Sequence, residues 1–258
     1  MSGGIKRDRD GSARTKPAQG NTPRGRFHSM FENFRDELDE HYDLKEKIAT
    51  ASRDITSQSK KIIFALHRVK HLNQEPPAID RDIGAHLDKI HDSMRSIHPY
   101  LNPVSRYRYA SSLRCLEEFV EAMSFMHYLR HQKLITFEEA QASIPLGVLI
   151  TPHDYMFGVF DLFGEMMRFA TVTTAQNGEM LRGNDGRTIL ADIQELGCSF
   201  ELLRRSPTKE YGNKMHAARQ SVQKVERLGY GLAVRGSERP KGWIPDMKDD
   251  MVETVSPI

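Results

Sequence analysis

The fold is decided by the stretch FHSMFENFRDELDEHYDLKEKIATASRDITSQSKKIIFALHRVKHLNQE, which occupies residues 27–75 and contains neither Gly nor Pro. Its apolar residues recur with the roughly 3.6-residue period of an amphipathic helix. They are Phe31, Phe34, Leu38, Tyr42, Ile48, Ile55, Ile62, Leu66 and Val69. The pattern predicts one long helix, and a helix of that length needs packing partners along it.

The remainder of the chain also has helical signals. A second helix is expected over residues 79–98, and another over residues 189–203. Capping chemistry marks four further helix starts, namely Asn102-Pro103 for a helix to about residue 132, Thr136 with Glu139, Thr151-Pro152 with Asp154, and Ser206-Pro207. No strand-like alternation of useful length occurs. We therefore predict an all-α bundle of about seven helices with a long N-terminal helix.

Composition excludes several classes of protein. The longest charge-free apolar stretch, residues 144–150, is far below the roughly 20 residues of a membrane-spanning helix, so no membrane association is expected. The N-terminus lacks the apolar core of a secretory signal. The only cysteines are Cys115 and Cys198, in apolar helical surroundings that suit a reducing compartment, so we expect a cytoplasmic and nuclear protein.

The net charge of +2 hides an uneven distribution. Residues 1–26 carry seven Lys or Arg against two Asp, a local charge of +5. This composition predicts a disordered basic tail over residues 1–26, followed by an all-α domain over 27–241 and an acidic tail over 242–258.

Two helices carry carboxylates where apolar surroundings should exclude them. Residues 116–126 are apolar almost all round, yet Glu118 and Glu121 stand three residues apart on one side. In the helix beginning near residue 152, Asp154, Asp161 and Glu165 fall within about 40° of one another. We expect these acids to form one site.

Buried carboxylates must be protonated, paired with cations or bound to a metal ion. An oxygen-only ligand set favours Mg²⁺, with Mn²⁺ as the alternative, over zinc. The Glu-x-x-His motif of di-iron sites and the HExxH zinc motif are both absent from the sequence. The competing interpretation is that the acids cap helices, face solvent in an oligomer channel, or pair with Arg106, Arg108 or Arg130.

Nucleic-acid binding is indicated by cations that alternate with rings. Arg106, Tyr107 and Arg108 combine charges for phosphates with a ring for base stacking. A second basic set lies on the first helix and just after it, at Lys60, Lys61 and Arg68. Solvated helix faces carry similar charges, so this signal alone does not decide the function.

Several segments resemble the translin-associated factor X branch of the translin family. They are SRDIT (52–56), EFVEAMSF (118–125), TPHDY (151–155) leading into Gly158, DLFGEMMR (161–168), KVE (224–226) and VRGSERPK (234–241). The resemblance covers about residues 27–241. It implies the translin-type bundle of seven helices, and it places that family's catalytic acids on Glu118, Glu121, Asp161 and Glu165.

The same resemblance implies a function. The chain would be the catalytic subunit of a hetero-oligomer with translin, an octamer by analogy, that cuts single-stranded RNA in a Mg²⁺-dependent reaction during small-RNA and transfer-RNA processing. Single-stranded DNA is a further expected ligand. Translin lacks the acidic pair that this chain keeps at Glu118 and Glu121. The alternative is a non-catalytic nucleic-acid-binding scaffold that stabilises translin.

Overall fold

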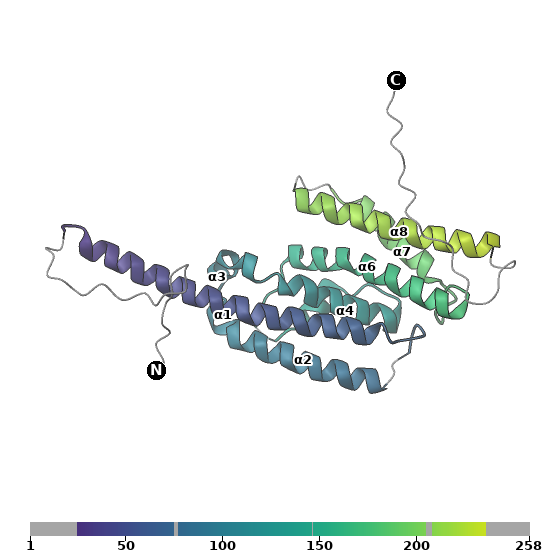
Figure 1. Cartoon of the computed structure of the whole chain (residues 1–258), viewed down its shortest axis with the longest axis horizontal. Helices are drawn as coiled ribbons and strands as arrows, with labels where there is room; N and C mark the ends of the chain where they lie inside the picture. Colours follow the sequence, from purple (N-terminus) through teal and green to yellow (C-terminus); the bar gives the residue numbers. More distant parts are fainter. Residues whose placement is uncertain (1–24, 75–76, 146, 205–207, 236–258) are drawn as a thin grey trace, which may run out of the picture. The chain divides into compact units, whose positions relative to one another are not determined.

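The structure, a computed structural model, describes residues 25–74, 77–145, 147–204 and 208–235. Its helices are α1 (His28–Leu66), α2 (Pro77–Ile97), α3 (Pro103–Arg108), α4 (Cys115–His131), α5 (Phe137–Ala142), α6 (Pro152–Asn177), α7 (Ile189–Glu201) and α8 (Lys209–Arg235) (Figure 1). Over these ranges the only β-type pairing is an isolated bridge between Arg182 and Thr188. The all-α prediction is confirmed.

Two predicted helix boundaries are wrong. The first helix ends at Leu66 rather than at residue 75. The N–H groups of Arg68 and Val69 bond three residues back, to the carbonyls of Ala65 and Leu66, and this tighter turn closes the helix. Asn73 has a positive φ of 58°, and its backbone N–H donates to the Leu129 carbonyl at 2.8 Å. The helix expected over 102–132 is interrupted after Arg108 by a 3₁₀ turn over Ala110–Ser112. This stretch contains two serines, whose side chains disfavour a helix interior because they can hydrogen-bond to nearby backbone groups.

Three of the four predicted caps lie within the described residues, and all three form as predicted. The Asn102 side chain accepts a hydrogen bond from the Ser105 N–H, and Thr136 and Thr151 each form a complete capping box. The cap predicted at Ser206-Pro207 lies outside the described residues. At the start of α8, the Thr208 hydroxyl accepts from the Tyr211 N–H at 3.3 Å.

The chain divides into two compact units, Met1–Leu44 and Lys45–Ile258, and the all-α domain expected over 27–241 stays a prediction. In the first unit the described part of α1 leaves its large apolar side chains exposed, with relative exposures from 43% to 65%. They are Phe27, Met30, Phe31, Phe34, Leu38 and Tyr42. The predicted tails over 1–26 and 242–258 lie almost entirely outside the described residues. No described helix is long and apolar enough to cross a membrane.

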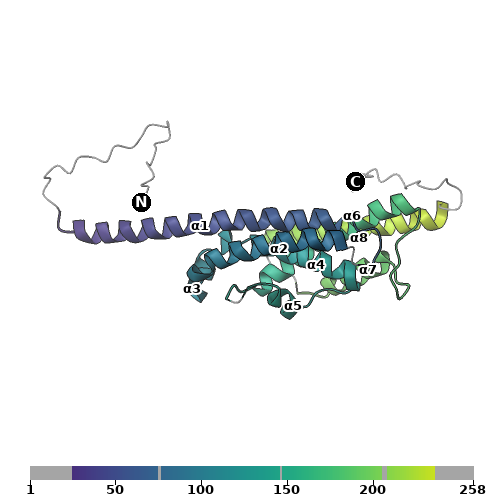
Figure 2. The ribbon, with the colours of Figure 1, turned by 90° about the horizontal axis from the view of Figure 1, so that it is seen from below.

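The core of the second unit is centred on α4 and α6, which pack along each other, with α8 on the other side of α6 (Figures 1 and 2). Phe119 and Phe125 of α4 and Phe163 of α6 are fully buried. The two helices approach closely at Gly158, where an added Cβ would lie 2.6 Å from Val120 Cβ and 2.7 Å from the Glu117 carbonyl oxygen. Only a residue without a side chain allows this approach.

Replacing Gly158 with Ala should therefore separate α4 from α6. We expect the G158A protein to lose about 1–3 kcal/mol of stability, the usual cost of overpacking, measured by thermal unfolding of the purified protein. Gly164 of the same helix is the matched control, because a Cβ there meets nothing within 4 Å. G164A should be neutral or stabilising by about 0.5–1 kcal/mol; equal losses in both variants would contradict the close-approach interpretation.

Candidate functional site

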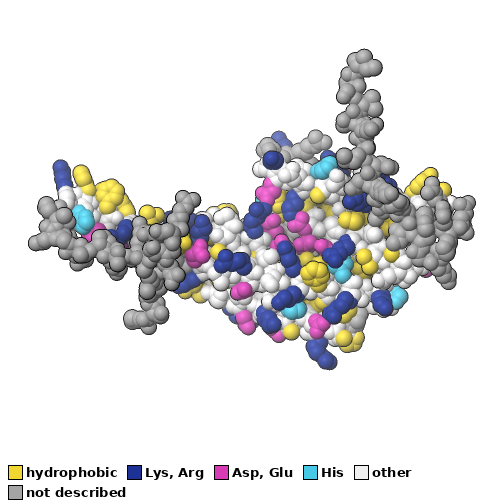
Figure 3. Space-filling model, in the orientation of Figure 1, with side chains coloured by type: hydrophobic (Ala, Val, Ile, Leu, Met, Phe, Trp, Pro, Cys, Tyr) yellow, Lys and Arg dark blue, Asp and Glu magenta, His cyan; other side chains and the backbone are white. Residues whose placement is uncertain are grey.

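The four acids assigned from the sequence come together in one cavity. Glu118 and Glu121 project from α4, and Asp161 and Glu165 project from α6, because spacings of three and four residues keep each pair on one helix face. All four line a cavity of about 480 Å³ that also contacts Lys60, Ile63, Phe64 and Arg168. Figure 3 shows acidic side chains gathered on this face of the molecule with Lys and Arg side chains around them.

Glu121 is the most buried of the four acids. It is 8% exposed and forms no ion pair with any described residue. Burial, followed by the neighbouring carboxylates of Asp161, Glu118 and Glu165, raises the pKa of its carboxyl to about 8. The cavity thus holds a carboxyl group that strongly favours a positive partner.

Each of the other three acids faces a basic side chain. Lys60 Nζ lies 3.7 Å from a Glu118 carboxylate oxygen, Lys214 of α8 pairs with Asp161, and the His67 ring contacts Glu165. The His67 ring also packs on Phe125 with a centroid distance of 5.0 Å. These three acids are therefore paired, as the competing interpretation expected of the acids, but by residues other than Arg106, Arg108 or Arg130; of these three, Arg106 pairs with Asp154.

Asp154 does not join the other acids. Its carboxylate accepts hydrogen bonds from the backbone and hydroxyl of Thr151, and the Arg106 guanidinium donates to it at 2.5 Å. Capping and a buried ion pair thus hold it at the start of α6, so its assignment to the site was wrong.

The residues predicted to bind nucleic acid separate into two groups. Arg106 is 7% exposed and is held by Asp154 and the Leu149 carbonyl, so its guanidinium does not fit the predicted contact with nucleic acid. Tyr107 is 77% exposed, and Arg108 is also exposed. Neither of these two lines the acidic cavity.

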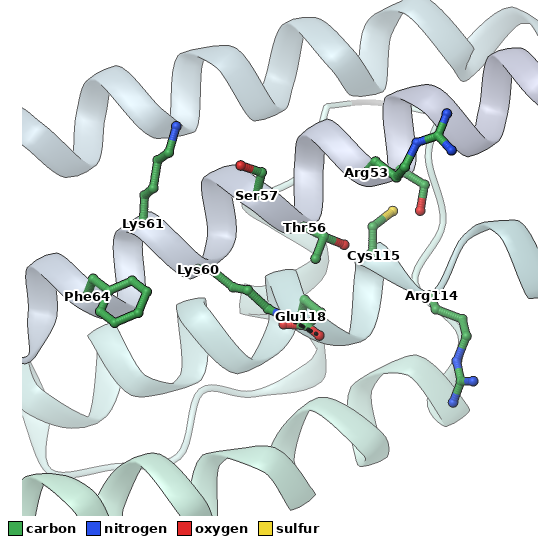
Figure 4. A pocket seen from close by; sticks show the side chains of 10 residues that line it. Arg53, Thr56, Ser57, Lys60, Lys61, Phe64, Arg114, Cys115 and Glu118 are labelled. Atoms are coloured by element: carbon green, nitrogen blue, oxygen red, sulfur yellow. Dashed lines mark ion pairs between the residues drawn. The ribbon is translucent and has the colours of Figure 1, made fainter.

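The basic residues of the first helix lie closer to the acids. Lys60 lines the acidic cavity itself. Lys61 points away from Glu118 (Figure 4), and Arg68 pairs with Asp82 at 2.6 Å. Of the predicted nucleic-acid contacts, the structure places only Lys60 at the acids.

A second cavity adjoins the acidic one along α1 and was not predicted. Its volume is about 540 Å³, and it shares Lys60, Phe64 and Glu118 with the acidic cavity. The remaining lining residues are Ser52, Arg53, Thr56, Ser57, Lys61, Arg114 and Cys115 (Figure 4). Residues 53, 56, 60, 64 and 67 follow one another at helical spacing and are mostly basic or polar, which could have indicated this surface. The apolar face of α1 dominates the sequence pattern, however.

The acidic cavity has a donor set that fits a hard divalent cation. Four carboxylates supply oxygen ligands, and the most buried of them, Glu121, forms no ion pair with a described residue, although the charge of Lys214 acts on it. A different group, Glu117, His153 and Asp154, has ligand atoms that all lie within 4.8 Å of one another. The Asp154 carboxylate is already taken by Arg106 and Thr151, which favours the four-acid cavity.

Comparison with known proteins adds a family and relatives. A model of the Translin family matches residues 43–236. The chain is similar to the Translin-associated protein X of Rattus norvegicus, with 29% identity covering 88% of this chain and 87% of that one. The Translin-associated protein X homolog of Schizosaccharomyces pombe is 28% identical and covers 81% of this chain and 89% of its own length.

Solved structures show the same fold. The crystal structure of AfC3PO superposes with a TM-score of 0.60 at 18% identity, covering 80% of this chain and 97% of that chain. The crystal structure of apo-NeC3PO gives a TM-score of 0.57 at 15% identity, covering 76% and 94%. Likeness at this level of identity establishes the helical architecture alone.

The raised pKa of Glu121 predicts how stability depends on pH without metal. The folded state holds this proton more tightly than the unfolded state, so the stabilisation is complete below the ordinary glutamate pKa and is lost as pH rises toward 8. Between pH 6 and 8 the chelator-treated protein should lose about 2 kcal/mol of stability through this one group.

Thermal unfolding in EDTA at several pH values measures this loss. We expect Glu121→Gln to remove that part of the pH dependence, and Mg²⁺ to weaken it in the unaltered protein by binding the ionised form. Glu138→Gln, at an exposed position, is the control and should follow the unaltered protein. Identical pH dependence in the Glu121 variant and the unaltered protein would contradict the assignment.

Proposed function

This chain belongs to the translin family, and from that premise we propose that it is the catalytic subunit of a hetero-oligomer with translin, a Mg²⁺-dependent endoribonuclease that cuts single-stranded RNA. The observation that carries the proposal is the single cavity lined by Glu118, Glu121, Asp161 and Glu165. A merely structural role does not explain four acids around one cavity, of which Glu121 is buried and the other three are partly buried, because their mutual repulsion is costly unless a cation is present.

Glu118, Glu121, Asp161 and Glu165 would hold the metal, directly or through water. The bound ion would polarise the scissile phosphate and lower the pKa of an attacking water. Glu118 or Glu121 would accept the water's proton on a carboxylate oxygen. Lys60, Lys214 and the exposed Arg168 surround the acids and supply the positive charge that attracts an RNA phosphate.

Assembly with translin is supported by the first unit. The exposed apolar side chains over residues 27–42 form the kind of surface that marks a protein partner. We propose a hetero-octamer that acts in the cytoplasm and nucleus on small-RNA and transfer-RNA precursors and also binds single-stranded DNA. Relatives named Translin-associated protein X support the choice of translin as the partner.

A second candidate function is a non-catalytic scaffold. The observation that favours it is the set of cations already facing three of the acids, Lys60, Lys214 and His67. In that case the acids would stabilise the fold through ion pairs, and RNA binding would depend on salt and not on metal.

Cleavage of a labelled single-stranded RNA by the chain co-purified with translin separates the two functions. We expect cutting in Mg²⁺, none in EDTA, and a loss of at least about 100-fold in kcat for Glu121→Gln, since both a metal ligand and proton transfer contribute on that scale.

Glu117→Gln is the matched control for this experiment. Glu117 is also a buried acid of α4, 7% exposed, but it does not line the four-acid cavity. Its variant should cut RNA at nearly the normal rate. Cutting that survives Glu121→Gln, or that is lost only in Glu117→Gln, would refute the proposed site, and an assembled complex that binds RNA without cutting it would favour the scaffold.

A further inference from the structure

The cavity beside the acids has the chemistry of a phosphate site. Hydroxyl groups of Ser52, Thr56 and Ser57 line it together with the guanidinium groups of Arg53 and Arg114 (Figure 4). Arginine and short hydroxyl side chains are the usual protein partners of nucleic-acid phosphates. The only acid in its lining is Glu118, which already faces Lys60 at 3.7 Å.

Of the two arginines in this cavity, Arg53 has the less competition from carboxylates. Its guanidinium donates to the Thr50 hydroxyl at 3.0 Å and forms no ion pair with a described residue. Arg114, by contrast, faces Glu117 at 3.7 Å and pairs with Glu210. An arriving phosphate would therefore meet Arg53 without displacing a carboxylate.

The cavity is continuous with the acidic site through Phe64 and Lys60. Phe64 lines both cavities, and its side chain is 60% exposed. The Arg168 guanidinium lies 5.7 Å from the centre of its ring. An exposed ring beside a polyanion site is a stacking platform for a base.

These residues follow one stripe of α1. Arg53 and Lys60 are seven residues apart, two turns or about 10 Å along the helix axis, with Thr56 between them and Phe64 one turn beyond Lys60. An RNA strand whose scissile phosphate lies at the carboxylates would thus pass over the Phe64 ring and continue toward the Arg53 guanidinium. The acids themselves repel phosphates, so the flanking contacts must come from such positions.

We propose that this stripe holds the substrate strand beside the cleaved bond, with Phe64 stacking on the base of the nucleotide next to that bond and Arg53 binding a phosphate further along the strand. The inference rests on the proposed function, since it names how the substrate strand is held at that same site. Both are positioning residues and neither touches the reacting atoms.

Binding of a labelled single-stranded RNA to the chain co-purified with translin tests the proposal. Every form of this chain in the binding measurement carries Glu121→Gln, so that no RNA is cut. Arg53→Gln should weaken binding by about fivefold to tenfold. It should also lower the slope of log affinity against log salt by about 0.7, the value for one phosphate contact on a single strand. Phe64→Leu should weaken binding to a similar degree and leave the salt slope unchanged, because stacking releases no counterions.

Arg95→Gln is the matched control, because it removes the same charge from an exposed position on α2. It should change neither the affinity nor the slope. RNAs with one neutral methylphosphonate at successive positions locate the contact. The complex with Arg53 intact should lose affinity when the neutral group replaces one phosphate beyond the nucleotide stacked on Phe64, and the Arg53→Gln complex should not respond to that substitution.

Equal salt slopes for Arg53→Gln and Arg95→Gln would overturn the proposal. Failure of Arg53→Gln to assemble with translin would also overturn it, because the cavity would then be a subunit contact. These outcomes differ from a failure of the proposed function, in which the complex with Glu121 intact binds RNA in Mg²⁺ and does not cut it.

Discussion

The close approach of α4 to α6 is the constraint on which the candidate site depends. Gly158 lets the α6 backbone lie against Val120 and the Glu117 carbonyl, and buried phenylalanines of both helices fill the space around this contact. The same approach forces Glu118 and Glu121 toward Asp161 and Glu165. Apolar burial, worth about 1.5–3 kcal/mol for each large side chain, offsets the repulsion that this arrangement creates. The fold therefore holds a carboxylate cluster that the four groups alone would not form.

The cations around the cluster come from other elements, which makes the site a product of the whole second unit. Lys60 belongs to α1 and Lys214 to α8, while His67 follows the end of α1. Each faces a different acid, so their charges are spread around the cavity rather than concentrated at Glu121. This distribution leaves the most buried carboxyl, that of Glu121, without an ion pair in the described chain, and burial followed by the three neighbouring carboxylates raises its pKa. It also explains why charge pairing and cation binding are compatible at one site.

The acids were predictable from the sequence because each lies in a helix that is otherwise apolar. A carboxylate within residues 116–126 stands out against its neighbours, and the helical period alone places Asp161 beside Glu165. The same reasoning failed for Asp154, where the period was right but the competing role as a cap was stronger. It failed for Arg106 because the prediction assumed an exposed guanidinium. That group is buried and donates to the carboxylate of Asp154, 48 residues away in the sequence. Arg53 could not be assigned, because its significance depends on which helix faces it. The segment after α1 is likewise held by a tertiary hydrogen bond from Asn73.

Under the proposed function, the cations have two competing sets of acceptors. In the described chain Lys60 and Lys214 face carboxylates, and a metal ion held by those carboxylates would compete with the lysines for the same oxygens. A phosphate entering beside the metal would then offer each lysine a new anionic partner at short range. Lys60 is half exposed, with 55% of its side chain accessible, so its ammonium can change partners at little cost in burial. The ion pairs that favour a scaffold are therefore compatible with catalysis. Without metal the lysines neutralise the carboxylates, and with metal bound they would neutralise the phosphate of the substrate.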